Sequence, residues 1–132
     1  MVTKILRFAS MVALLGSVGC ASTVAVRGAE GEVLVSFTSG LGRKVLVNAI
    51  SVYEITDGLP RPVCEVRIRS MGPGAELTSW FYGSEPAGYE TKCEQLVRNK
   101  KYAVSVFAVD HDTAGTNFML GPDGKVVDTG LK

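Results

Sequence analysis

An alternation of apolar and polar residues recurs along the chain and predicts β-strands, because successive side chains of a strand point to opposite faces. The cleanest case is 63–70, in which Cys64 and Val66 share one face while charged residues occupy the other. The same period occurs in 32–38 and in the second half of 96–110. We therefore expect strands at these three places, with Cys64 facing the core.

A longer apolar segment at 44–55 departs from this pattern, because its apolar residues change from odd to even positions midway. A β-bulge near Asn48 and Ala49 would produce such a change by inserting one extra residue into the strand. The prolines of the following segment, 56–62, lack the N–H group that a central strand requires. We predict a turn there.

The segment 76–83 contains consecutive aromatic residues and is predicted as another strand. Trp80 and Tyr82 share one of its faces and form a candidate interaction surface, because Trp and Tyr are enriched in protein interfaces. The usual role of aromatic side chains favours the alternative, in which two of the three aromatic residues fill the core and one lies under a loop.

Turn-forming residues dominate the remaining segments. We expect a polar loop at 84–95, a hairpin loop at 110–117, a short strand at 118–120 and a tight turn at 121–124. No internal repeat is present.

Leu96 precedes Tyr102 across a polar turn, and Tyr102 begins an alternating apolar run. This spacing resembles the tyrosine corner of fibronectin type III and immunoglobulin sandwiches, in which the phenol bonds to upstream backbone. We therefore expect one all-β domain over 32–132, a sandwich of about seven strands of the immunoglobulin or fibronectin III kind. A transthyretin-like sandwich is the alternative, because the sequence does not separate these strand orders.

The first residues have the plan of a secretory signal, with a basic segment at 1–7 and an uncharged, mostly apolar segment at 8–19. The apolar segment is shorter than the roughly 18 residues that a transmembrane helix needs. Small residues directly before Cys20 resemble the lipobox of bacterial lipoproteins, although Ser17 stands where leucine is commonest. The resemblance implies that 1–19 is a signal peptide and that Cys20 is acylated. Ordinary cleavage after Ala21 is the alternative.

Acylation would make the membrane a partner of the chain through Cys20, and stable anchoring needs two or more acyl chains. We expect 20–31 to be a tether, because it offers little apolar surface to bury. The residue after the cysteine, Ala21, is not acidic. By resemblance to the lipoprotein family this favours the periplasmic face of the outer membrane.

Assigning Cys20 to the anchor leaves Cys64 and Cys93. In an exported chain such cysteines most simply form a disulfide, and a metal site or a reactive thiol is the alternative. A metal site needs further ligands nearby, such as a CxxC pair or clustered histidines. The chain has one histidine and no CxxC. We therefore expect a disulfide, which would contribute on the order of 3–4 kcal/mol to stability.

Charge and motif content argue against several functions. Lys and Arg number 14 against 13 Asp and Glu, without a basic stripe, so we expect no nucleic acid partner. His111 is the only histidine, and no serine lies in a nucleophile elbow. Asp110 and Asp112 begin a spacing like that of a calcium loop, but Ala114 stands where a third ligand would lie, which favours a polar hairpin tip. We expect that the chain is not an enzyme and that it binds no metal, cofactor or small-molecule substrate.

The order of features from Val63 to Val127 supplies a second resemblance: a strand with Cys64, an aromatic strand at 80–82, Cys93, Tyr102 with Val104, and the 123–124 turn. Small bacterial periplasmic lipoproteins described as type VI secretion immunity proteins share this order and the lipobox. The resemblance implies a membrane-anchored protein-binding module that neutralises a toxin acting in the periplasm. An accessory lipoprotein of an envelope or secretion complex is the alternative.

Overall fold

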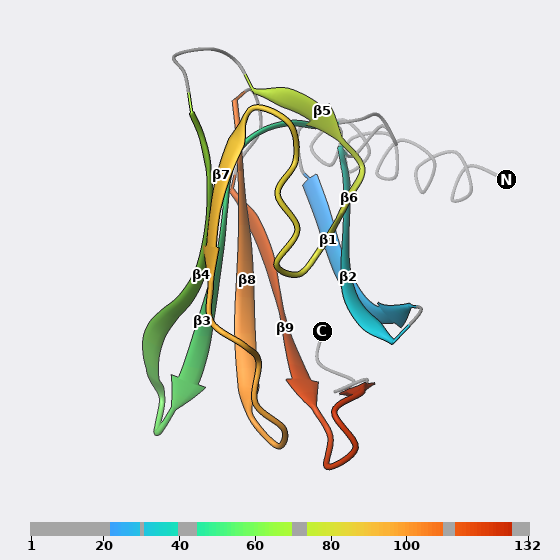
Figure 1. Cartoon of the computed structure of the whole chain (residues 1–132), viewed down its shortest axis with the longest axis vertical. Helices are drawn as coiled ribbons and strands as arrows, with labels where there is room; N and C mark the ends of the chain where they lie inside the picture. Colours follow the sequence, from blue (N-terminus) through green and yellow to red (C-terminus); the bar gives the residue numbers. More distant parts are fainter. Residues whose placement is uncertain (1–21, 30, 40–44, 70–73, 110–112, 128–132) are drawn as a thin grey trace, which may run out of the picture.

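The structure, a computed structural model, describes residues 22–29, 31–39, 45–69, 74–109 and 113–127. All regular secondary structure in these ranges is β-strand, which confirms the expected all-β class (Figure 1). The strands are β1 (Ser22–Ala29), β2 (Glu32–Ser39), β3 (Val45–Thr56), β4 (Leu59–Ile68), β5 (Ala75–Leu77), β6 (Ser79–Phe81), β7 (Tyr89–Cys93), β8 (Lys101–Ala108), β9 (Ala114–Leu120) and β10 (Val126–Val127).

The strands form two antiparallel sheets. The smaller sheet has the order β1-β2-β6, and the larger, curled sheet has the order β10-β9-β8-β3-β4-β7, with β5 also paired to β3. The chain changes sheets between Leu77 and Ser79, because β5 pairs with β3 while β6 pairs with β2. Figure 1 shows the long strands of the larger sheet beside the smaller sheet.

The core lies between the two sheets and takes alternate residues from each strand. The smaller sheet contributes Val35, Phe37 and Trp80 to it. The larger sheet supplies most of the rest, and its most deeply buried residues are Val45, Val47, Ile50, Val52, Val66, Tyr89, Tyr102 and Val104. Cys64 is also buried, as its strand phase predicted.

Two irregularities shift the phase of the central strands. The β3–β8 register shifts between Val47 and Ala49, which confirms the predicted bulge at Asn48 and lets Val47 and Ile50 both face the core. A second shift, in the β3–β4 pair, leaves Val63 as the extra residue. As a result the adjacent residues Val63 and Cys64 are both buried.

The predicted turn at 56–62 is shorter in the structure than in the sequence analysis. Asp57 and Gly58 form its tip with φ angles of 53° and 77°, and β4 already begins at Leu59. Pro60 and Pro62 lie in β4, paired with β3 on one side only, because β7 first pairs with β4 at Cys64. The prolines therefore occupy an edge, where no donor is needed.

Residues 22–29 form a strand and are not a tether, which corrects the expected start of the domain. β1 pairs with β2 along its whole length, and Val24 and Val26 pack against the core. This strand is hard to predict from the sequence, because its small residues bury little apolar area by themselves. The backbone hydrogen bonds between β1 and β2 hold the strand in place, although its small side chains bury little apolar area.

Two further boundaries differ from expectation. β7 lies inside the segment predicted as a polar loop, and β9 begins at Ala114, inside the predicted hairpin loop. β7 is an edge strand whose exposed face carries Glu90 and Lys92, so its sequence reads as polar. Residues 110–112 of the predicted hairpin loop lie outside the described ranges.

The free edge of β7 is covered by the segment that precedes it. Thr91 donates its backbone N–H to the Glu85 carboxylate over 3.0 Å and its hydroxyl to the Ser84 carbonyl over 3.0 Å. The Arg69 guanidinium donates to the carbonyl of Tyr89 over 2.9 Å. These bonds occupy backbone groups that an edge strand otherwise leaves open.

Cys64 and Cys93 lie directly opposite each other in the β4–β7 pair and form a disulfide, which confirms the predicted pairing. A disulfide is typical of proteins that work in an oxidising compartment outside the cytoplasm. It also joins β7, which is paired to the sheet on one side only, to the buried part of β4. No helix in the described ranges is long and apolar enough to cross a membrane.

Tyr89 links three segments in the core. Its hydroxyl accepts the backbone N–H of Ala75 at 2.8 Å and donates to the carbonyl of Val47. Gly74 packs so closely on the Val47 carbonyl, with a φ of 86°, that a Cβ atom would collide with it. This contact fixes the chain just before β5, where it begins its passage to the second sheet.

We predict that Tyr89→Phe lowers the free energy of unfolding by about 1–3 kcal/mol, because it leaves the part-buried N–H of Ala75 and the buried carbonyl of Val47 without their partner. Urea denaturation of the purified full chain measures the change. Tyr53→Phe is the matched control, because none of the hydrogen bonds found in the described ranges involves the Tyr53 side chain. Equal stability of the two variants would contradict the prediction.

Candidate functional site

Trp80 is a core residue, which agrees with the favoured alternative for this aromatic segment and rules out Trp80 as an interaction surface. It is 2% exposed, and its indole N–H donates to the carbonyl of Ser84 over 2.9 Å. Tyr82 shares its face as predicted, with the two rings 5.6 Å apart. Tyr82 is only partly buried, and its hydroxyl donates to the carbonyl of Glu94 over 2.7 Å. Tyr82 thus remains a candidate surface residue.

The other residues singled out by sequence fall into two groups. Cys64 and Cys93 are joined to each other and are not metal ligands. Cys20, Asp110, His111 and Asp112 lie outside the described ranges. Within those ranges, no group of three or more His, Cys, Asp or Glu side chains is placed to hold a metal ion.

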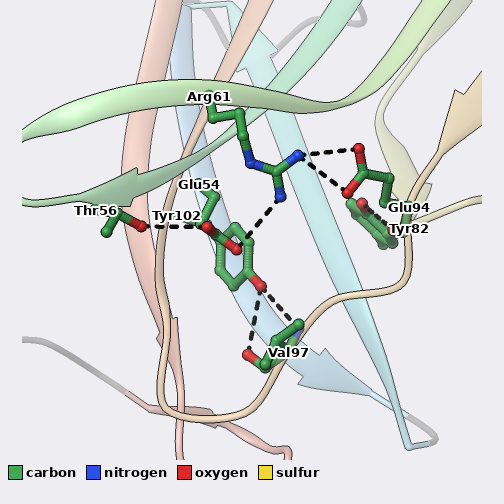
Figure 2. Close-up of polar contacts among 7 residues, drawn as sticks. All are labelled: Glu54, Thr56, Arg61, Tyr82, Glu94, Val97 and Tyr102. Atoms are coloured by element: carbon green, nitrogen blue, oxygen red, sulfur yellow. Dashed lines mark hydrogen bonds and ion pairs between the residues drawn. The ribbon is translucent and has the colours of Figure 1, made fainter.

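The predicted tyrosine corner is confirmed. The backbone N–H of Val97 donates to the Tyr102 hydroxyl over 2.7 Å, and that hydroxyl also lies 3.4 Å from the carbonyl of the same residue (Figure 2). The Tyr102 ring stacks on Phe118 with centroids 5.3 Å apart. The loop before β8 is thereby fixed to the core.

A charged cluster lies beside this corner, as Figure 2 shows. The Arg61 guanidinium contacts both carboxylate oxygens of Glu94 at 3.1 and 3.2 Å and lies 3.7 Å from Glu54. The hydrogen bond that Arg61 donates to Glu94 and the negative charge of Glu94 raise the pKa of Arg61. Because Arg61 and Glu94 are exposed, the pair orients side chains more than it stabilises the fold.

Exposed apolar residues flank the cluster. Leu59 is 72% exposed and Val97 is 50% exposed. The register pairs Leu59 with Thr56 and Arg61 with Glu54, so Leu59 and Arg61 point to the same side of the hairpin. We call Leu59, Arg61, Tyr82, Glu94 and Val97 the hairpin-end surface.

A second candidate lies on the outer face of the larger sheet. A depression of about 390 Å³ there is lined by Asn48, Ala49, Ser51, Tyr53, Arg67 and Phe107, among others. Glu65 borders it and accepts a hydrogen bond from Arg67 at 2.9 Å, which raises the pKa of Arg67. We call this site the outer-face depression.

Ser51 distinguishes this depression from an ordinary surface hollow. It is 7% exposed, yet no hydrogen bond of its hydroxyl is found within the described ranges. A buried hydroxyl without a partner costs about 1–3 kcal/mol. Because the depression is open, the Ser51 hydroxyl can bond to water or to a hydrogen-bonding ligand that enters.

Of the hairpin-end surface, the sequence pattern indicates Tyr82 alone, and the outer-face depression is not predicted, although a signal for it is present. The inward positions of β8 are the even ones, and Phe107 is an aromatic residue at an odd, outward position. Tyr53 is outward in β3 for the same reason, after the bulge. No sequence pattern indicates that Leu59 is exposed, because its exposure depends on how far the β3–β4 hairpin extends.

Comparison with known proteins identifies no relative. No protein-family model matches the chain, and no curated protein matches it significantly.

Burial raises the pKa of the Tyr82 and Tyr102 hydroxyls above the usual value of 10.0. A raised pKa in the folded state means that the ionised phenol is disfavoured there. The stability from the neutral phenols is therefore complete below pH about 10 and is lost as the pH rises above it.

We accordingly expect the unfolding free energy of the full chain to fall between pH 9 and pH 11.5, measured by urea denaturation at about half-unit intervals of pH. The fall is smaller in Tyr82→Phe, because one ionising group is removed. Parallel pH profiles for the two proteins would show that Tyr82 ionises as freely in the folded state as in the unfolded state.

Proposed function

We propose that this chain is an exported protein-binding module that works in the periplasm and docks its partner on the hairpin-end surface. The observation that carries the proposal is the exposure of Leu59 and Val97 beside a Tyr and an Arg–Glu pair. Tyr and Arg are enriched in protein-binding hot spots, and the exposed apolar side chains beside them add area that a partner can bury. The tyrosine corner fixes the loop of Val97 in advance, which reduces the entropy lost on docking.

The fold proposed for this module is an immunoglobulin or fibronectin III-like sandwich. Support comes from the order in which the chain visits the sheets: β1 and β2 in the smaller sheet, β3 and β4 in the larger, β6 in the smaller, β8 and β9 in the larger. The tyrosine corner at the start of β8 adds to this support. Sandwiches of this kind present end loops as binding surfaces on a rigid frame.

A lipid anchor at Cys20 is the second part of the proposal. The leader pattern supports it, and the disulfide fits the periplasm to which such a leader would direct the chain. Because β1 begins at Ser22, an acylated Cys20 would be separated from the sandwich by a single residue. The domain would then sit directly on the membrane, and its partner would have to meet it there.

Mass spectrometry of the N-terminal peptide, from protein made in a bacterial envelope, tests the anchor. We expect Cys20 to be the first residue and to carry acyl chains, and Cys20→Ser to appear in the soluble fraction. A mature chain that begins after Cys20 would contradict the anchor and leave the protein-binding proposal standing.

The proposed partner is a toxin that acts in the periplasm. Support comes from the resemblance to immunity lipoproteins of type VI secretion, which rests on the lipobox, the cysteine pair and the 123–124 turn. The alternative function is that of an accessory lipoprotein of an envelope complex. An immunity protein would block one toxin with a tight one-to-one complex, whereas an accessory protein would copurify with several envelope proteins.

Docking is tested with Leu59→Glu and Val97→Glu in the full chain, immobilised and exposed to solubilised envelope proteins. We expect each change to weaken binding of a captured partner by about ten- to a hundredfold, because a buried charge replaces an apolar anchor. Val109→Glu is the matched control, since Val109 is 46% exposed but lies after β8, at the other end of that strand. Binding that is unchanged in both variants, or lost equally in the control, would exclude this surface.

A further inference from the structure

We propose that the outer-face depression is a binding site for a neutral saccharide of about two sugar units. This site is distinct from the hairpin-end surface and goes beyond the proposed protein docking. The inference rests on the floor, the aromatic borders and the balanced charges of the depression.

The floor is formed by two small residues of β3, Ala49 and Ser51, and Ser51 lies opposite Glu65 of the neighbouring strand β4. Ser51 of β3 lies opposite Ser105 of β8, which lies opposite Gly115 of β9. A Cβ atom on Gly115 would lie 3.5 Å from the Ser105 hydroxyl and 2.6 Å from the Val104 carbonyl. The absence of a side chain at Gly115 therefore leaves the sheet surface beside the depression uncovered next to the Ser105 hydroxyl.

Aromatic residues stand on opposite sides of this floor. Tyr53 follows Ser51 by two positions in β3, and Phe107 follows Ser105 by two positions in β8. Because the strands are antiparallel, these steps lead in opposite directions away from the Ser51–Ser105 pair. At about 3.4 Å per residue, the two aromatic residues border a floor roughly 13 Å long, which suits a disaccharide.

The polar groups at the rim suit hydroxyls. Arg67 offers donors, Glu65 offers acceptors 2.9 Å away, and Asn48, which is exposed, offers both. Sugar hydroxyls donate and accept together, and the carbon-bound hydrogens of a sugar ring can pack on the Tyr53 and Phe107 rings. Because the charges of Arg67 and Glu65 balance, the rim gives a charged ligand no advantage over a neutral one.

The Ser51 hydroxyl favours a ligand that can form a hydrogen bond with it. A wholly apolar group in the depression would cut Ser51 off from water without giving it a partner. An anionic group would have to compete with Glu65, which already accepts a hydrogen bond from Arg67 at 2.9 Å, for the guanidinium at the rim. A hydroxyl-bearing ring is the class that satisfies the floor and the borders together.

Titration of the full chain, labelled with ¹⁵N, with cellobiose, lactose and chitobiose tests the proposal. We expect at least one of these disaccharides to produce saturable amide shifts centred on Ala49, Ser51 and Phe107. Ser51→Ala and Phe107→Ala should each weaken this binding by about five- to tenfold, because one loses a hydrogen bond and the other an aromatic border.

Asn117→Ala and Leu59→Glu are the controls, and both should bind the sugar as the unchanged chain does. Asn117 is exposed on β9 beyond the depression, and Leu59 belongs to the hairpin-end surface. Absence of shifts with every disaccharide would overturn the saccharide site, as would shifts that survive in Ser51→Ala and Phe107→Ala. Protection of the same amides by a captured protein would also overturn it, in favour of a second protein contact.

Discussion

β3 is the strand on which the rest of the molecule depends. It pairs with β8 on one side and with β4 and β5 on the other, so it connects every part of the larger sheet. The Val47 carbonyl of the same strand receives the Tyr89 hydroxyl, which brings β7 and the start of β5 to it. A disturbance of β3 would therefore reach both sheets, because β5 leads directly into β6.

The bulge at Asn48 decides what each face of β3 can do. Before it, odd residues such as Val47 face the core, and after it even residues such as Ile50 do. The change releases Ser51 and Tyr53 to the outer face, where they meet residues of β8 and β4. One extra residue thus completes the core and also creates the outer-face depression.

Much of the fold could be predicted from the sequence because its signals are local. The alternation at 63–70, the phase change at Asn48 and the spacing of Leu96 and Tyr102 each depend on a few neighbouring residues, and the structure agrees with all three. β7 is hard to predict because its partner, β4, lies far back along the chain, and β1 because its small residues give a weak pattern even though β2 follows it directly. The candidate site could be predicted only in part: the burial of Trp80 follows the usual role of aromatic residues, whereas the exposure of Leu59 depends on how far the β3–β4 hairpin extends, which no local pattern encodes.

The edge of the larger sheet that β4 and β7 form is protected, and this protection affects how the protein aggregates in a crowded compartment. An open strand edge invites pairing with another copy of the chain and so begins aggregation. Here Pro60 and Pro62 remove donors from one part of that edge, and the segment around Glu85 occupies the part formed by β7. The protection is built from the chain's own turns, so it remains when the protein is concentrated, without help from a chaperone.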